Sequence, residues 1–132
     1  MYKFFLLSFV LSFLFSCVTV NEENNARFDS RCPIMSNEER IAHEKLPYYR
    51  PPPYYPGEAV RKGIEGYVDF EFDISVQGHP INIGVIEVYP SDIFVKAGLQ
   101  SVKGHKYDIR IVNGEPAVSH CHSIRIVFEL EK

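Results

Sequence analysis

Residues 66–76 alternate between apolar and polar side chains at every step. The apolar positions are Val68, Phe70, Phe72, Ile74 and Val76. The polar positions are Tyr67, Asp69, Glu71, Asp73 and Ser75. A period of two residues predicts a strand with one face buried and the other in water. We therefore expect the three carboxylates on the solvent face, as a charged edge that keeps the sheet soluble.

Two more strands follow the same rule. Gln77-Gly78 favours a tight connection, after which Ile81, Ile83 and Val85 continue the buried face. The phase then changes to Ile86 and Val88, which indicates a β-bulge. Residues 123–131 alternate again near the carboxyl end. Their inward positions are Ile124, Ile126, Phe128 and Leu130, opposite Arg125, Val127, Glu129 and Glu131.

Two short helices fit between these strands. Pro56 suits the first turn of a helix over residues 57–62, and Gly63 suits its end. Ser91 or Asp92 can cap a second helix, in which Gly98 costs about 1 kcal/mol but permits close contact with the sheet. Asn113-Gly114 marks a turn. The predicted fold is α+β, with about three antiparallel strands and two short helices on one face.

Composition adds limits to this picture. The 132 residues suffice for one small domain plus extra segments. The net charge of −3 gives no basic footprint, so a nucleic-acid partner is not expected. Trp is absent, but ten Phe and eight Tyr residues provide an aromatic core.

The amino end does not belong to that core. Residues 4–15 form an apolar run of the length of a secretory signal, and the run closes in Leu14-Phe15-Ser16-Cys17, which resembles a lipobox. We favour cleavage before Cys17 with lipid attachment to its sulfur, as in an outer-membrane lipoprotein. The alternative is an uncleaved inner-membrane anchor over residues 4–20, close to the lower length limit for a span. Residues 1–16 are accordingly assigned to a signal peptide, residues 17–46 to an arm and residues 47–132 to the domain.

The cysteine count agrees with export to an oxidising compartment. When Cys17 is acylated, Cys32 and Cys121 remain as an even pair. A disulfide between them would tie the arm to the sheet. Two unrelated thiols are an equally good interpretation, because the sequence does not show the distance that a bridge requires.

Residues 46–56 read LPYYRPPPYYP and favour an extended polyproline conformation. We call this segment the strap. A partner-binding Pro-rich motif is one interpretation. The one we favour is a stiff connection that lays Tyr side chains across the sheet and leads into the first helix.

The chain shows little that points to catalysis. His120 and His122 are expected on one face of a strand and Cys121 on the other, so this trio, even with His79 and His105, does not provide converging metal ligands. The carboxylates at Asp69, Glu71 and Asp73 are explained as a solvated face. No nucleophile–base motif, phosphate loop or nucleotide fingerprint is present. We therefore expect no enzyme, no catalytic residues, no metal and no cofactor.

A spread of positions over the second half resembles the carboxy-terminal domain of the TonB family. The matching residues are Tyr55, Pro56, Ala59, Gly66, Val68, Gly78, Phe94, Ala97, Tyr107, Gly114, Pro116, Val118 and Phe128. In this family the domain captures a short segment of an outer-membrane transporter. The resemblance therefore implies a periplasm-facing, membrane-anchored interaction protein.

The closing strand comes last in a small open sheet, so we expect it at an edge, where an extended peptide can add to its backbone. By the resemblance, Ser123, Arg125, Val127 and Glu129 would flank such a peptide. Tyr55, Pro56, Lys106 and Tyr107 would shape the nearby surface. For Tyr55, Pro56 and Tyr107, a role in packing the fold is at least as good an explanation.

Some features depart from the family. Residues 18–50 could stretch to roughly 100 Å at most, which is short for a crossing from the inner membrane. His105 stands where the family has Trp, and Ile109 where it has Pro. Two hypotheses follow: a TonB-like component of energy-coupled uptake, or a lipid-anchored envelope protein that binds another protein or itself as a homodimer without energy transfer.

Overall fold

The computed structural model describes residues 26–27, 31–33, 38 and 45–132. The predicted signal peptide over residues 1–16, the alternative anchor over residues 4–20 and the predicted lipid-attachment residue Cys17 lie outside these ranges. Within them, no helix is both long and apolar enough to cross a membrane.

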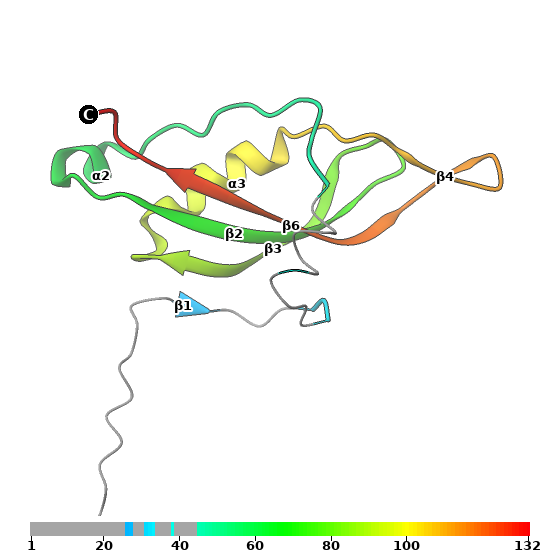
Figure 1. Ribbon diagram of the computed structural model, residues 1–132, viewed down its shortest axis with the longest axis horizontal. Coiled ribbons are helices and arrows are strands. Elements are labelled where there is room, and N and C mark those ends of the chain that lie inside the picture. The colour runs from blue at the N-terminus through cyan, green and yellow to red at the C-terminus, as the bar shows by residue number, and fades with distance from the viewer. Residues whose placement is uncertain (1–25, 28–30, 34–37, 39–44) are drawn as a thin grey trace, which may run out of the picture.

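Three long strands form the centre of the molecule, as the alternation predicts. They are β2 (Gly66–Ile74), β3 (Pro80–Tyr89) and β6 (Ser119–Phe128). The two-residue strand β1 (Ala26–Arg27) adds to β3, which gives an antiparallel sheet of order β1-β3-β2-β6 (Figure 1). Strands β4 (Arg110–Val112) and β5 (Glu115–Ala117) form a separate hairpin that the sequence pattern did not predict. Its turn lies at Asn113-Gly114, where φ is positive at both residues, so the predicted turn is confirmed.

The helices lie where the sequence places them. Helix α2 spans Gly57–Lys62 and ends at Gly63, whose left-handed backbone closes the last turn. A 3₁₀ turn, η1 (Asp92–Phe94), leads into α3 (Val95–Lys103), which lies over one face of the sheet (Figure 1). A Cβ atom on Gly98 would come within 2.9 Å of the Phe70 ring, so this glycine permits the close helix–sheet contact that the sequence suggested.

The core lies between α3 and this face of the sheet, which we call the helix face. Its buried residues are Ala59, Val68, Phe70, Phe72, Ile74, Val88, Phe94, Ala97, Val102, Tyr107, Ile124, Ile126 and Phe128. Phe94 stacks on Phe128 with ring centroids 4.3 Å apart, and Tyr55 meets both rings edge-on. Val76, predicted to be buried, is 37% exposed because β2 ends at Ile74 and the chain turns there.

The opposite face of β2 corrects the sequence analysis. Asp69, Glu71 and Asp73 are only 3%, 5% and 1% exposed, so the predicted solvated face is in fact covered. Strand β2 is central rather than at an edge, and side chains from both neighbouring strands fold over its second face. The arm segment Arg31–Pro33 adds further cover, because Arg31 bonds to Glu71 and Asp73. We call this side of the sheet the carboxylate face.

The predicted bulge in β3 is confirmed, and two unpredicted ones occur, one near Asn82 in β3 and one in β6. In β3, Val85 pairs with Phe70 and Glu87 with Asp69, which leaves Ile86 as the extra residue. In β6, His122 pairs with Phe72 and Ser119 with Ile74, so both His120 and Cys121 lie opposite Asp73. Cys121 has a φ of 59° at this point.

The β6 bulge overturns the prediction that His120 and His122 share a face. His120 approaches Asp73 on the carboxylate face, with 3.4 Å between Nδ1 and Oδ2. His122 instead tilts against Phe72 on the helix face and bonds to the Ser119 hydroxyl at 2.7 Å. Within the described ranges, no three His, Cys, Asp or Glu side chains gather in a way that could hold a metal ion.

Candidate functional site: the β6 edge and the carboxylate face

Strand β6 pairs with β2 on one side and has no neighbouring strand on the other side within the described part of the chain. An edge of this kind presents backbone N–H and C=O groups to an incoming chain. Figure 1 shows β6 at the upper edge of the sheet, above β2, from the base of the β4–β5 hairpin towards the carboxyl terminus. The strand is therefore placed for the addition of an extended peptide.

Three of the four residues expected to flank a peptide are positioned by their partners on β2. Ser123 pairs with Glu71, Arg125 with Asp69 and Val127 with Tyr67, so these three belong to the carboxylate face. Val127 is 51% exposed, and Glu129 follows the end of the strand in the open. Alternating inward residues anchor β6 in the core, since Ile124, Ile126 and Phe128 are buried.

Arg125 is held in one geometry by β2. Its Nε and Nη2 atoms each donate to a different Asp69 carboxylate oxygen at 2.7 Å, which makes a bidentate pair. The guanidinium also lies 3.7 Å from the centre of the Tyr67 ring. The hydrogen bond to Asp69 raises the pKa of Arg125 above its ordinary value, although burial opposes the shift.

Tyr67 continues this row of contacts towards β3. Its hydroxyl donates to Glu87 at 2.7 Å, and its ring stacks with Tyr89 at 5.7 Å between centroids. Burial and the bond to Glu87 raise the pKa of Tyr67. Arg125, Tyr67 and Tyr89 thus form a continuous surface across three strands beside the open edge. Sequence reasoning missed this row, although opposite charges on two predicted neighbouring strands were a usable signal.

Asp73 is a second carboxylate on this face that is held by several hydrogen bonds. Its Oδ1 accepts from the Cys121 backbone N–H at 2.9 Å and lies 3.0 Å from Arg31 Nη2. Its Oδ2 accepts from Asn82 at 3.0 Å. Burial opposes ionisation of Asp73, but these hydrogen bonds and the Arg31 charge outweigh it and hold its pKa well below the usual range.

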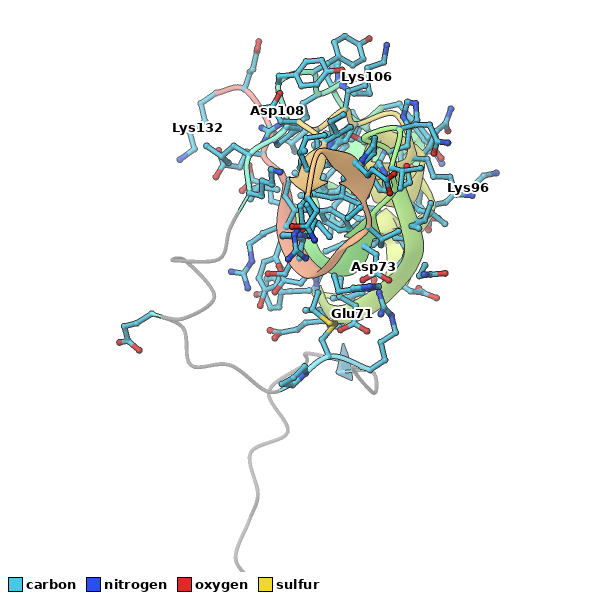
Figure 2. The ribbon with its side chains drawn as sticks, turned by 90° about the vertical axis from the view of Figure 1, so that its right-hand side faces the viewer. Glu71, Asp73, Lys96, Lys106, Asp108 and Lys132 are labelled. Carbon is cyan, nitrogen blue, oxygen red and sulfur yellow. A yellow bond between two sulfur atoms is a disulfide. The ribbon has the colours of Figure 1, made fainter. Side chains whose placement is uncertain are left out.

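Cys32 and Cys121 are joined by a disulfide, with Cα atoms 5.7 Å apart. Figure 2 shows Glu71 and Asp73 on the side of the sheet that carries this bond, whereas Lys106 and Asp108 lie on the opposite side. The bond therefore ties the arm to β6 across the carboxylate face.

The predicted flanking residues are not all at the surface. Tyr107 is 1% exposed and packs against Phe72, and Tyr55 donates its hydroxyl to the Ile64 carbonyl at 2.7 Å. Pro56 precedes α2 as its N-cap residue. Lys106 is exposed, and its ammonium lies 5.4 Å from the centre of the Tyr49 ring. The contacts of Tyr55, Pro56 and Tyr107 agree with a role in packing the fold.

The strap follows the surface beside α3 and leads into α2 as predicted, but it does not lay its Tyr side chains across the sheet. Tyr48 N–H donates to Lys106 O at 2.9 Å, and the Ser101 hydroxyl donates to Pro51 O at 2.6 Å. The side chains of Tyr48, Tyr49 and Tyr54 remain exposed, so only Tyr55 of the four strap tyrosines packs into the core.

Comparisons with known proteins give a consistent result. A sequence model of the family described as the Gram-negative bacterial TonB protein C-terminal matches residues 51–130. Protein TonB of Vibrio cholerae serotype O1 is 32% identical over 79 residues, which cover 60% of this chain and 32% of that protein. The chain thus spans about a third of the length of this curated relative.

Two solved structures are similar in sequence and in fold. The solution NMR structure of the Pseudomonas aeruginosa TonB CTD is 31% identical, with a TM-score of 0.56 over 67% of this chain and 89% of that one. The TonB2 protein from Vibrio anguillarum is 27% identical, with a TM-score of 0.52 over 81% of this chain and 96% of that one.

Proposed function

Because the chain belongs to the family of Gram-negative TonB carboxy-terminal domains, we propose that its β6 edge captures an extended segment of an outer-membrane transporter during energy-coupled uptake. The family consists of interaction and energy-transduction proteins, so this chain is not an enzyme. In this proposal the domain faces the periplasm and is anchored through its amino-terminal part.

The observation that carries the proposal is the open side of β6. Backbone pairing along this side would provide affinity, since each added residue finds N–H and C=O partners that are already fixed in a strand. Side chains on alternate positions would provide specificity. Ser123, Arg125 and Val127 belong to the carboxylate face, and in this proposal they and Glu129, just past the strand end, would meet every second residue of the added peptide.

A test of the docking edge uses the full chain, labelled with ¹⁵N, and synthetic peptides that tile the periplasm-exposed amino-terminal segments of outer-membrane transporters. We expect one or more peptides to slow amide exchange and shift resonances along residues 119–129. Replacing Val127 with Pro should abolish capture, because Pro removes a donor and disrupts strand pairing. Val127→Ala is the matched control and should keep capture, since it retains the N–H group.

The fold of each variant is checked separately by the dispersion of its α3 and β3 resonances. A Val127→Pro protein that is folded and still captures the peptide contradicts strand addition. For the case in which this variant unfolds, a peptide N-methylated at alternate residues supplies the same test on the intact protein. Unchanged binding of that peptide would also contradict the proposal.

A second candidate function is a lipid-anchored envelope protein that binds another protein, or itself as a homodimer, without energy transfer. The Leu14–Cys17 sequence favours it. Mass spectrometry of the amino terminus separates the two candidates. A diacylglyceryl group on Cys17 supports the lipid-anchored protein, and an intact Met1–Val20 segment supports an inner-membrane transducer.

A further inference from the structure

The disulfide connects two parts of the chain that the fold otherwise keeps apart. Cys32 belongs to the arm, and Cys121 lies in the bulge at the start of β6. Cys121 is two residues before Ser123, the first of the β6 residues proposed to flank a bound peptide. Any force applied to β6 therefore reaches Cys32 after passing along only a few residues of an already extended strand.

Non-covalent contacts hold both ends of this cross-link in place. Asp73 Oδ1 accepts from the backbone N–H of Cys121 and lies 3.0 Å from Arg31 Nη2, next to Cys32 in sequence. The Arg31 N–H donates to Glu71 at 2.9 Å. Both carboxylates are on the central strand β2, so the junction of arm and edge strand is braced against the rigid middle of the sheet.

The route through the rest of the chain is much weaker. Without the disulfide, tension between the arm and β6 would pass along the chain beyond Pro33 and reach the strap. As far as Tyr54 the strap is bound to the domain by hydrogen bonds such as those from Tyr48 to Lys106 and from Ser101 to Pro51, and only Tyr55 packs into the core. Exposed segments with few buried contacts open at low free energy. The strap would therefore separate first, and α2 and β2 would follow.

We propose that the Cys32–Cys121 disulfide makes the arm and the peptide-docking strand one mechanical unit, so that tension between the protein's amino-terminal anchor and a peptide on β6 bypasses residues 33–120. This inference rests on the proposed function, because that function puts a load on β6. The bypassed segment contains α2, β2, β3, α3 and the β4–β5 hairpin. If this segment unfolded, the extended chain between the amino-terminal anchor and the bound peptide would lengthen by about 300 Å. The disulfide prevents this lengthening.

Single-molecule force spectroscopy tests this idea without any bound peptide. The full chain carries Cys17→Ser, a biotin handle at its amino end and an azide-bearing residue in place of Glu129 for the second handle. Under oxidising conditions we expect no step that releases residues 33–120 before the tether breaks. In the Cys32→Ser/Cys121→Ser chain we expect an early extension step, as the strap detaches, that the oxidised chain lacks.

Three outcomes would overturn the inference. The double-serine chain could bear the same force without a step, which would show that non-covalent packing carries the load. The oxidised chain could show the step, which would show that the bond does not form in the protein. Arg31→Ala keeps both cysteines and should still show no step; a step there would show that the bond forms only while Arg31 holds the arm against β2. Since the handle on residue 129 replaces the peptide, these results are independent of whether any peptide binds in the capture assay.

Discussion

At the scale of single residues, the buried side chain of His105 makes the stability of the fold depend on pH. The side chain is 0% exposed, and its Nδ1 lies 3.2 Å from the Tyr107 hydroxyl. Its Nε2 has no hydrogen-bond partner among the described residues. Burial, and to a lesser degree the charge of Arg50, lower the pKa of His105 to about 4. The imidazole is therefore neutral in the folded protein.

This pKa predicts a loss of stability in mild acid. Between pH 6.5 and 4 the unfolded chain takes up a proton at His105 that the folded chain does not, so the free energy of unfolding falls as the pH falls. The full loss is on the order of 3 kcal/mol. Urea denaturation of the wild type at several pH values should show this slope, and His105→Phe should show a smaller one, which comes from groups such as Asp73. An equal slope in both proteins would contradict the prediction.

Gly98 gives a second prediction at this scale. Ala at this position gains about 1 kcal/mol in helix propensity, but its Cβ would meet two atoms of the Phe70 ring at 2.9 and 3.0 Å. Phe70 is fully buried, so the ring cannot move away without disturbing the core. We expect Gly98→Ala to lower the free energy of unfolding by about 1 kcal/mol net.

The control for this change is Gly57→Ala in α2. There the new Cβ would meet only the flexible end of Arg61, at 3.4 Å, and Gly57 is exposed. Chemical denaturation should find this variant as stable as the wild type or more stable. A Gly98→Ala protein that matched it would mean that the α3–sheet contact is looser than described.

At the scale of elements, the pairing of β2 with β6 depends on a charged pair. Asp69 is buried and Arg125 is about half exposed, so removal of the arginine leaves a carboxylate inside the sheet. We expect Arg125→Ala to cost about 2 kcal/mol of unfolding free energy. In the double variant Asp69→Asn/Arg125→Ala the cost should be smaller than the sum of the two single costs, as measured by urea denaturation. Additive costs would argue against the pair.

The elements themselves were largely predictable from the sequence. Period-two alternation identified β2 and β6, and the phase change identified the bulge at Ile86, because both signals depend only on which side chains must be buried. Gly63 and Asn113-Gly114 marked an end and a turn, because their left-handed backbone favours these residue types. The position of β6 at an edge followed from its place as the last strand of a small sheet.

The carboxylate face could not be predicted in the same way. Alternation shows that two faces differ but not that a separate segment covers the polar one. Cys32 offered a tie from the arm to the sheet, but the sequence left that disulfide and two unrelated thiols equally open. The bulge at Cys121 was also hidden, because His120, Cys121 and His122 carry no periodic apolar signal. Because of this one inserted residue, His120 and His122 lie on opposite faces of the sheet instead of sharing one face.

At the scale of the whole molecule, the disulfide joins residues 89 positions apart. A cross-link that closes so long a loop stabilises mainly by limiting the unfolded chain, by about 3–4 kcal/mol in typical cases. We expect Cys32→Ser/Cys121→Ser to lose stability of this size, measured by urea denaturation of chains that also carry Cys17→Ser. A loss below about 1 kcal/mol would contradict this prediction.

The same separation has a consequence for biogenesis. In a chain exported amino end first, Cys32 emerges long before Cys121, and the nearest thiol available to it is Cys17, fifteen positions earlier. Oxidation at that stage would join Cys17 to Cys32 in a non-native disulfide and leave Cys121 as a free thiol. Acylation of Cys17 would remove the competing thiol, so Cys32 would stay reduced until Cys121 is exported and can pair with it. Lipid attachment would then act as a safeguard on maturation as well as a means of retention at the membrane.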